Sequence, residues 1–134
     1  MNRKMLVLVA LMLSVVALPA KTQDRFRVDF DHISIYNPST DKWSEWEQVN
    51  HTFVFNINNN KDIMHYRANG NRVTYRNISG AERNKTSDGK EYQITTLLDA
   101  DGEEFLFQLF DDTSIGVIFT FQSGIRVQFA SADN

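Results

Sequence analysis

The amino-acid sequence predicts an all-β fold, an antiparallel meander of eight or nine strands. From residue 24 onward, apolar residues recur at every second position, which is the period of a half-buried β-strand. Clusters rich in Asn, Asp, Ser and Gly, the residues that turns prefer, separate these stretches, and no long pattern of helical period competes with them. The expected strands cover residues 24–36, 43–49, 51–57, 62–68, 71–78, 91–98, 103–110, 114–121 and 125–130.

In the first expected strand, the apolar residues change from even-numbered to odd-numbered positions part-way along. Val28 and Phe30 are even-numbered apolar residues, whereas Ile33 and Ile35 are odd-numbered. We therefore expect a β-bulge or break near Asp31-His32, because one extra residue reverses which side chains face inward.

The segment 40–47 allows two interpretations. As one turn of helix it brings Trp43 and Trp46 to the same side, because residues three apart are neighbours on a helix. As a strand it places the two rings on opposite faces. A short strand with an irregular start is the favoured interpretation.

Turn residues set the expected register of the middle strands. Asp101-Gly102 favours the two-residue type I′ turn, in which both central residues have positive φ. With this pair at the tip of a hairpin, Leu98 lies opposite Phe105, and Ile94 lies opposite Leu109. One face of the hairpin is then almost wholly apolar, as a buried face should be.

The pair Asn69-Gly70 is interpreted in the same way. It places Tyr66 opposite Val73, and it puts Met64 and Tyr66 on the buried face. His65 is then expected to point outward.

The last hairpin has the clearest pattern. Apolar residues alternate over residues 115–121 and again over 125–129. A three-residue connection, Gln122-Ser123-Gly124, with Gly124 in the left-handed conformation, keeps both sets on one side of the hairpin.

Short connections between successive strands predict a sheet that closes on itself. Eight or more twisted strands with one apolar face tend to close, because closure removes the unpaired edges. An up-and-down, lipocalin-like barrel is therefore expected. A two-sheet sandwich is the alternative, and pairing between the first and last strands decides between the two.

Residues 1–20 have the layout of a secretory signal peptide. A cationic start, Asn2-Arg3-Lys4, precedes an uncharged apolar run over residues 5–18, and small residues stand at Ala17 and Ala20. No later segment approaches the roughly 18 apolar residues that a membrane span needs. We expect an exported protein, periplasmic or secreted and without a membrane span, in which residues 21–134 form a single all-β domain.

The chain contains no cysteine. Disulfides are therefore excluded despite the expected export, and a lipid anchor on a cysteine after the leader is excluded as well. Removal of Arg3 and Lys4 with the leader reduces the 14 basic residues to 12, against 17 acidic ones. This negative balance argues against nucleic acid as a partner.

No motif indicates catalysis, a metal site or a cofactor. The three histidines, His32, His51 and His65, belong to no HExxH or similar pattern. The acidic stretch 99–103 resembles the start of a calcium loop, but Phe110 stands where the bidentate Glu would be. We therefore expect no enzyme, and we assign no catalytic residue, no metal and no cofactor.

Two groups of side chains are candidates for contact with a ligand or a partner. The first group is basic and shares the outward face of the expected sheet: Arg67, Arg72 and Arg76. In the expected register Arg67 lies directly opposite Arg72, and like charges that face each other are unfavourable, so either the register is off by one residue or the group contacts an anion or an acidic partner. The second group is aromatic, lies at a strand end and a connection, and suits a carbohydrate or a protein surface: Tyr36, Trp43 and Trp46.

Two short stretches carry a resemblance to a known group of proteins. Trp43-Ser44-Glu45-Trp46 and Asp99-Ala100-Asp101-Gly102 resemble the W-x-x-W and D-x-D-G stretches of small exported all-β proteins of Gram-negative bacteria. The resemblance covers residues 24–122. Those proteins are largely uncharacterised, so the resemblance implies a periplasmic or secreted setting but no catalytic or ligand-binding residues.

The leading functional hypothesis is a non-enzymatic, exported β-barrel binding module for a small apolar ligand or a protein surface. The alternative is a structural or interaction protein with a filled core that associates, as a homodimer, through an edge strand. A cavity of roughly a few hundred Å³ favours the first. A filled core with an extensive subunit contact favours the second.

Overall fold

The computed structural model describes residues 24–132, which form one all-β domain. The expected signal peptide, residues 1–20, lies outside this range. Within the described range no helix is long and apolar enough to cross a membrane. The ten strands are β1 (Phe26–Asn37), β2 (Lys42–Trp43), β3 (Glu47–Phe55), β4 (Ile63–Tyr66), β5 (Arg72–Asn77), β6 (Glu82–Lys85), β7 (Glu91–Leu98), β8 (Glu104–Phe110), β9 (Val117–Phe121) and β10 (Arg126–Ala130).

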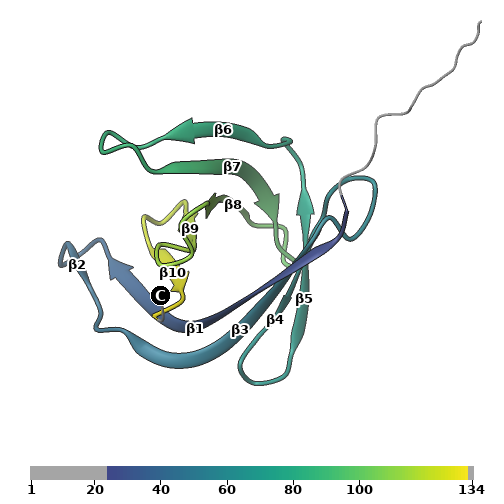
Figure 1. The fold of residues 1–134 in the computed structure, drawn as a ribbon. Coiled ribbons are helices and arrows are strands. Elements are labelled where there is room, and N and C mark those ends of the chain that lie inside the picture. Colours follow the sequence, from purple (N-terminus) through teal and green to yellow (C-terminus); the bar gives the residue numbers. More distant parts are fainter. Residues whose placement is uncertain (1–23, 133–134) are drawn as a thin grey trace, which may run out of the picture.

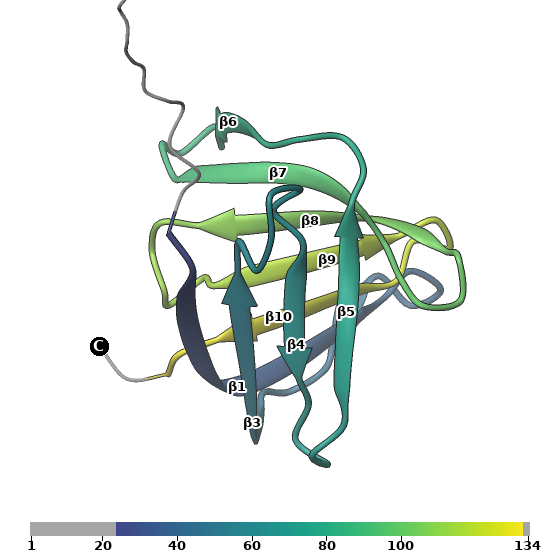
Figure 2. The same ribbon diagram turned by 90° about the vertical axis from the view of Figure 1, so that its right-hand side faces the viewer.

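Eight of these strands close into an antiparallel up-and-down barrel (Figure 1). The last strand, β10, pairs with β1 over five positions, from His32↔Ala130 to Tyr36↔Arg126. This first-to-last pairing confirms the barrel rather than the sandwich. In Figure 2, β3, β4 and β5 run across the direction of β7 to β10.

The barrel wall is weakest between β5 and β7. These strands pair at only two positions, which involve Arg76 and Asn77 of β5. After β5 the chain moves away from the end of β7, and β6 then pairs with the first half of that strand. The sequence did not predict β6, because its four residues are all polar and exposed and have no alternation.

Four hairpins share one five-residue turn. In each, the backbone N–H of the first residue donates to the carbonyl of the fifth, and the N–H of a glycine at the fourth position donates to the carbonyl of the first. The four glycines have φ of 88°, 92°, 86° and 94°, the left-handed conformation that a three-residue loop with a G1 bulge needs. The turns cover residues 67–71, 86–90, 99–103 and 121–125.

The expected register between β7 and β8 is wrong by one residue. Gly102 has a positive φ but Asp101 does not, so the type I′ turn does not form. The side chain of Asp99 instead accepts hydrogen bonds from two backbone N–H groups of the loop, at 2.9 and 2.8 Å, which stabilises the longer turn. As a result Leu97, in place of Leu98, is fully buried in the barrel.

The register between β4 and β5 is wrong for the same reason. Gly70 has a positive φ and Asn69 does not. His65, rather than Tyr66, therefore lies opposite Val73 and faces the interior. The sequence did not exclude the wrong register, because residues 63–66, Ile-Met-His-Tyr, offer an apolar face with either parity.

Two other local expectations are confirmed. Gly124 has φ 94°, and Val127 lies opposite Phe119, as the three-residue turn requires. The register of β1 on β3 shifts between Phe30 and His32, where the bulge was expected.

The segment 40–47 is a short strand followed by an irregular connection. The strand β2 ends at Trp43, and β3 starts at Glu47. Trp43 packs against Tyr36 with 5.4 Å between ring centroids, and Trp46 packs against His32 at 6.5 Å. The two tryptophans therefore contact different parts of β1, and the helical alternative is excluded.

Side chains fill the centre of the barrel, and most of them are aromatic. Phe53, for example, contacts Phe107 and Phe119 edge-on, with centroid separations of 6.1 and 5.9 Å. The core cluster contains Phe30, Phe53, Phe55, Ile63, Tyr75, Leu97, Phe105, Phe107, Val117, Phe119 and Phe129.

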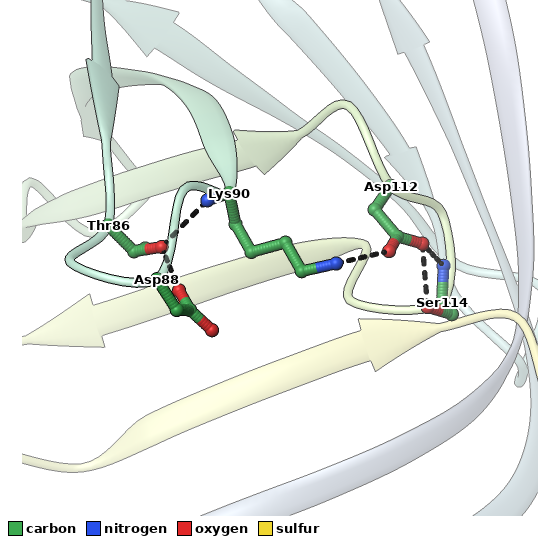
Figure 3. A network of polar contacts seen from close by, with 5 residues as sticks. All are labelled: Thr86, Asp88, Lys90, Asp112 and Ser114. Carbon is green, nitrogen blue, oxygen red and sulfur yellow. Dashed lines mark hydrogen bonds and ion pairs between the residues drawn. The ribbon is translucent and has the colours of Figure 1, made fainter.

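Polar contacts join two loops at one end of the barrel (Figure 3). Lys90 forms an ion pair with Asp112 at 3.4 Å, and Asp112 accepts hydrogen bonds from the backbone and the hydroxyl of Ser114. The hydroxyl of Thr86 donates to Asp88 and accepts from the backbone of Lys90. The bonds from Ser114, more than the contact with Lys90, lower the pKa of Asp112. The β6–β7 turn is thereby linked to the β8–β9 loop.

We predict that Gly116→Ala strongly destabilises the protein. A Cβ at Gly116 would lie 1.9 Å from the backbone oxygen of Phe129, and its φ of 76° disfavours a side chain. We expect the free energy of unfolding in urea to fall by roughly 4 kcal/mol or more. The control Gly89→Ala, with nothing within 4 Å of its Cβ and φ 92°, should lose only about 1–2 kcal/mol. Equal losses in the two variants would contradict the close approach.

Candidate functional site

A cavity that we call the aromatic cup opens at one end of the barrel. It encloses about 220 Å³. Its walls are mainly phenylalanine rings, and its polar groups are two imidazoles, one phenol, one guanidinium and one carboxylate. The lining residues are His51, His65, Arg67, Tyr75, Asp99, Phe105, Phe119, Phe121, Val127 and Phe129.

Three of the five-residue turns position the rim of the aromatic cup. Their first residues, Arg67, Asp99 and Phe121, all belong to its lining. Side chains alternate along a strand, so each of these residues faces the same side as the residue two positions earlier. In all three strands that earlier residue is buried, and the first residue of the turn is therefore directed inward.

A chain of hydrogen bonds forms the polar part of the aromatic cup. His51 Nδ1 lies 2.9 Å from His65 Nε2, and His65 Nδ1 lies 2.8 Å from the Tyr75 hydroxyl oxygen. His65 is only 3% exposed and stacks on Phe53 with 4.2 Å between ring centroids. Burial of a polar ring is costly unless it is hydrogen-bonded, and here both nitrogens of His65 have partners.

Burial keeps the groups of this chain uncharged at neutral pH. Burial, with smaller contributions from His51 and Arg67, lowers the pKa of His65 to about 3. Burial and then Arg67 also lower the pKa of His51. Burial raises the pKa of Tyr75, although Arg67 acts in the opposite direction. The charges in the lining of the aromatic cup are therefore those of Arg67 and Asp99.

Arg67 and Asp99 both line the aromatic cup but do not pair. Among the described residues, no carboxylate lies within 4.0 Å of the Arg67 guanidinium. Both charges act on Tyr75, since Arg67 lowers and Asp99 raises the pKa of its hydroxyl. Asp99 Oδ1 accepts two hydrogen bonds within its own turn, and Oδ2 has no partner in the described part of the chain. Each charge is thus available to a ligand.

A second cavity, the polar slot, lies where β5 ends and β6 begins. It encloses about 320 Å³. Its polar groups are largely bonded to protein groups: Asn77 accepts a hydrogen bond from Thr95 at 3.0 Å, and Arg83 pairs with Asp111 at 2.7 Å and Glu91 at 3.2 Å. It is therefore a weaker candidate than the aromatic cup. The lining residues of the polar slot are Phe55, Asn56, Lys61, Ile63, Asn77, Ala81, Arg83, Gln93, Thr95, Phe107 and Leu109.

The predicted basic face does not form as expected. Arg67 belongs to the aromatic cup, because the one-residue shift in register turns it inward. Arg72 and Arg76 are exposed on the outer face of β5, and their contact with a ligand or partner stays a prediction. The same error in register led to the wrong expectation that His65 points outward. A three-residue turn at Gly70 would have placed both Arg67 and His65 inside.

The predicted aromatic group lies outside the aromatic cup. The Arg126 guanidinium lies over the ring of Tyr36, 5.3 Å from its centroid, and the Tyr36 hydroxyl donates to Asp41. Trp43 and Trp46 are 40% and 49% exposed. Contact of this group with a ligand or partner also stays a prediction.

Neither a metal cluster nor a related protein indicates the activity. Across residues 24–132, no three His, Cys, Asp or Glu side chains come together in a way that suits a metal ion. No family model, curated protein or solved structure matches the chain. Any functional conclusion therefore rests on the geometry of the aromatic cup.

We predict that acid destabilises the protein through His65. Its pKa is about 3 in the fold against 6.5 for a free imidazole, so between these values the unfolded chain binds one more proton than the folded one. The free energy of unfolding should therefore fall by about 1.4 kcal/mol per unit as the pH drops from about 6.5 to 4, and His51 adds to this loss. Urea unfolding at several pH values measures the slope.

Two variants test the assignment. His65→Gln should reduce the slope between about pH 6.5 and 4 by about 1.4 kcal/mol per unit and leave the part that His51 contributes. Tyr75→Phe should lose roughly 1–3 kcal/mol at pH 7, because it leaves one nitrogen of His65 unbonded, but should keep the slope. An unchanged slope in His65→Gln would show that other groups cause the acid sensitivity.

Proposed function

We propose that the protein is a non-enzymatic β-barrel binding module that takes a small, mainly apolar ligand into the aromatic cup. The observation that supports this most is an open space of about 220 Å³, walled by aromatic rings, next to a barrel centre that aromatic side chains fill. An apolar cavity of about 150 Å³ holds benzene. A single aromatic ring with a short substituent is therefore the expected size of ligand.

The polar groups of the aromatic cup favour binding over catalysis. An imidazole with a pKa of about 3 is a weak base at neutral pH, and both nitrogens of His65 already have partners. The hydrogen-bonded chain and the packed rings also hold the walls in place before a ligand arrives. Such preorganisation reduces the entropy lost on binding.

The alternative role, association through an edge strand, has weaker support. The filled centre of the barrel fits it, but the two strands outside the closed barrel are poor edges. β2 has two residues, and β6 has four, all polar and exposed. Short, charged strands discourage pairing between chains.

We further propose that the protein is exported. The layout of residues 1–20 and the absence of cysteine support a free periplasmic or secreted product. Expressed in a Gram-negative host, the chain should appear in the periplasm or medium, and its intact mass should correspond to loss of about 20 residues. Cytoplasmic protein of full-length mass would contradict export.

We predict that Val127→Trp blocks the aromatic cup. The probe is 3-phenylpropan-1-ol, a neutral ring with a short chain, and an NMR shift titration measures its affinity. Val127 lines the aromatic cup, so the larger ring should weaken binding at least about tenfold. Leu106→Trp, which adds the same ring at a 42% exposed position on β8, should bind as the wild type does. Binding by Val127→Trp as tight as that of the wild type contradicts the proposal.

A further inference from the structure

The rim of the aromatic cup carries two charges that a purely apolar ligand would leave unused. Arg67 and Asp99 begin the β4–β5 and β7–β8 turns, and β5 and β7 are neighbours in the wall. Both side chains line the same 220 Å³ of space, yet no ion pair joins them. A positive and a negative group therefore stand separately above aromatic walls.

From this arrangement, and resting on the proposed function, we propose that the ligand is an aromatic zwitterion, of the class of aromatic α-amino acids. Its ring occupies the aromatic cup, its carboxylate binds Arg67, and its ammonium group binds Asp99.

Arg67 suits a carboxylate. A guanidinium presents N–H groups in a planar fork that matches the two oxygens of a carboxylate. The described chain supplies no carboxylate within 4.0 Å of this one, and the guanidinium interacts instead with the neutral Tyr75 hydroxyl, whose pKa it lowers. A ligand carboxylate would supply the missing partner.

Asp99 suits an ammonium group. Its Oδ1 is held by the backbone N–H groups of Asp101 and Glu103, which fixes the orientation of the carboxylate. Its Oδ2 has no hydrogen-bond partner among residues 24–132, and Asp99 belongs to the lining of the aromatic cup. The three N–H groups of an ammonium are donors of the kind that this oxygen needs.

The remaining groups of the aromatic cup explain why both charges of the ligand matter. His51, His65 and Tyr75 are neutral, so the lining has one positive and one negative charge. A ligand with a single charge would pair with one of them and leave the other without a charged partner. A ligand with both charges forms two charge-assisted contacts instead of one.

The walls suit a flat ring. The ring centroids of Phe105 and Phe119 are 4.9 Å apart, and the two rings are tilted against each other. The ring centroids of Phe119 and Phe129 are 5.2 Å apart, and these rings meet edge-on. Aromatic rings favour such tilted contacts over face-to-face ones, so a ligand ring can continue the same packing.

Four probes of similar size test the inference: L-phenylalanine with both charges, 3-phenylpropanoate with only the carboxylate, 2-phenylethylamine with only the ammonium, and neutral 3-phenylpropan-1-ol. NMR shift titrations at pH 7 measure their affinities. L-phenylalanine should bind at least about tenfold more tightly than either singly charged probe.

Three variants assign the two charges. Arg67→Gln should remove the advantage of L-phenylalanine over 2-phenylethylamine, and Arg67→Lys should keep part of it. Asp99→Asn, which retains Oδ1 for the turn, should remove the advantage over 3-phenylpropanoate. The control Lys85→Gln removes an exposed cation on β6, which does not line the aromatic cup, and should leave all affinities unchanged.

The outcomes separate this inference from the proposed function. If all four probes bind equally, if a singly charged probe binds best, or if Arg67→Gln and Asp99→Asn keep the full preference, the inference is wrong, although the apolar site stands. If none of the four probes binds, both are wrong. An unfolded Arg67→Gln leaves Arg67→Lys and Asp99→Asn to decide.

Discussion

The left-handed glycine at the fourth position of each five-residue turn is the constraint on which this structure depends. It makes the loop one residue longer than a two-residue hairpin turn. Because side chains alternate with a period of two, that single residue decides which of the two alternating sets of side chains in a strand faces the core. At one end of the barrel the same choice directs Arg67, Asp99 and Phe121 inward. The chemistry of the aromatic cup is therefore determined by turn geometry.

A consequence of this constraint is that the barrel must accommodate polar rings in its interior. His65 would be costly there alone, but His51 and Tyr75 bond to its two nitrogens. The imidazole is thereby retained in its neutral form, next to packed phenylalanine rings. The same groups that stabilise the interior at neutral pH also form the floor against which a ligand would lie, so the stability of the fold and the shape of the site are coupled.

The distribution of volume in the barrel determines what kind of ligand fits. Large aromatic side chains fill the middle, and open space remains towards the ends, where turns and strand breaks interrupt the packing. The site is therefore shallow and small, with charges at its rim and rings at its walls. This shape suits a compact molecule with one ring and polar substituents, and it does not suit a long acyl chain.

The sequence by itself determined the fold class, most strand positions, the bulge in β1 and the last hairpin. These features are local: alternation, turn residues and a parity change are properties of a few neighbouring residues. The expected strand at residues 91–98 coincides with β7. The expected register was wrong in β4, where either parity offers apolar residues, and in β7, where the apolar residues that alternate face away from the buried Leu97. The strand β6 was not expected, because it has no apolar residues.

Only the tertiary structure decided how distant residues meet. Two turn lengths were both consistent with Asn69-Gly70 and Asp101-Gly102, and only the closed barrel, with its single interior, distinguishes them. The meeting of Arg67 with Asp99 depends on strand pairing between β5 and β7, which no short-range pattern encodes. Local sequence specifies which side chains alternate, whereas closure of the sheet specifies which of them share an interior.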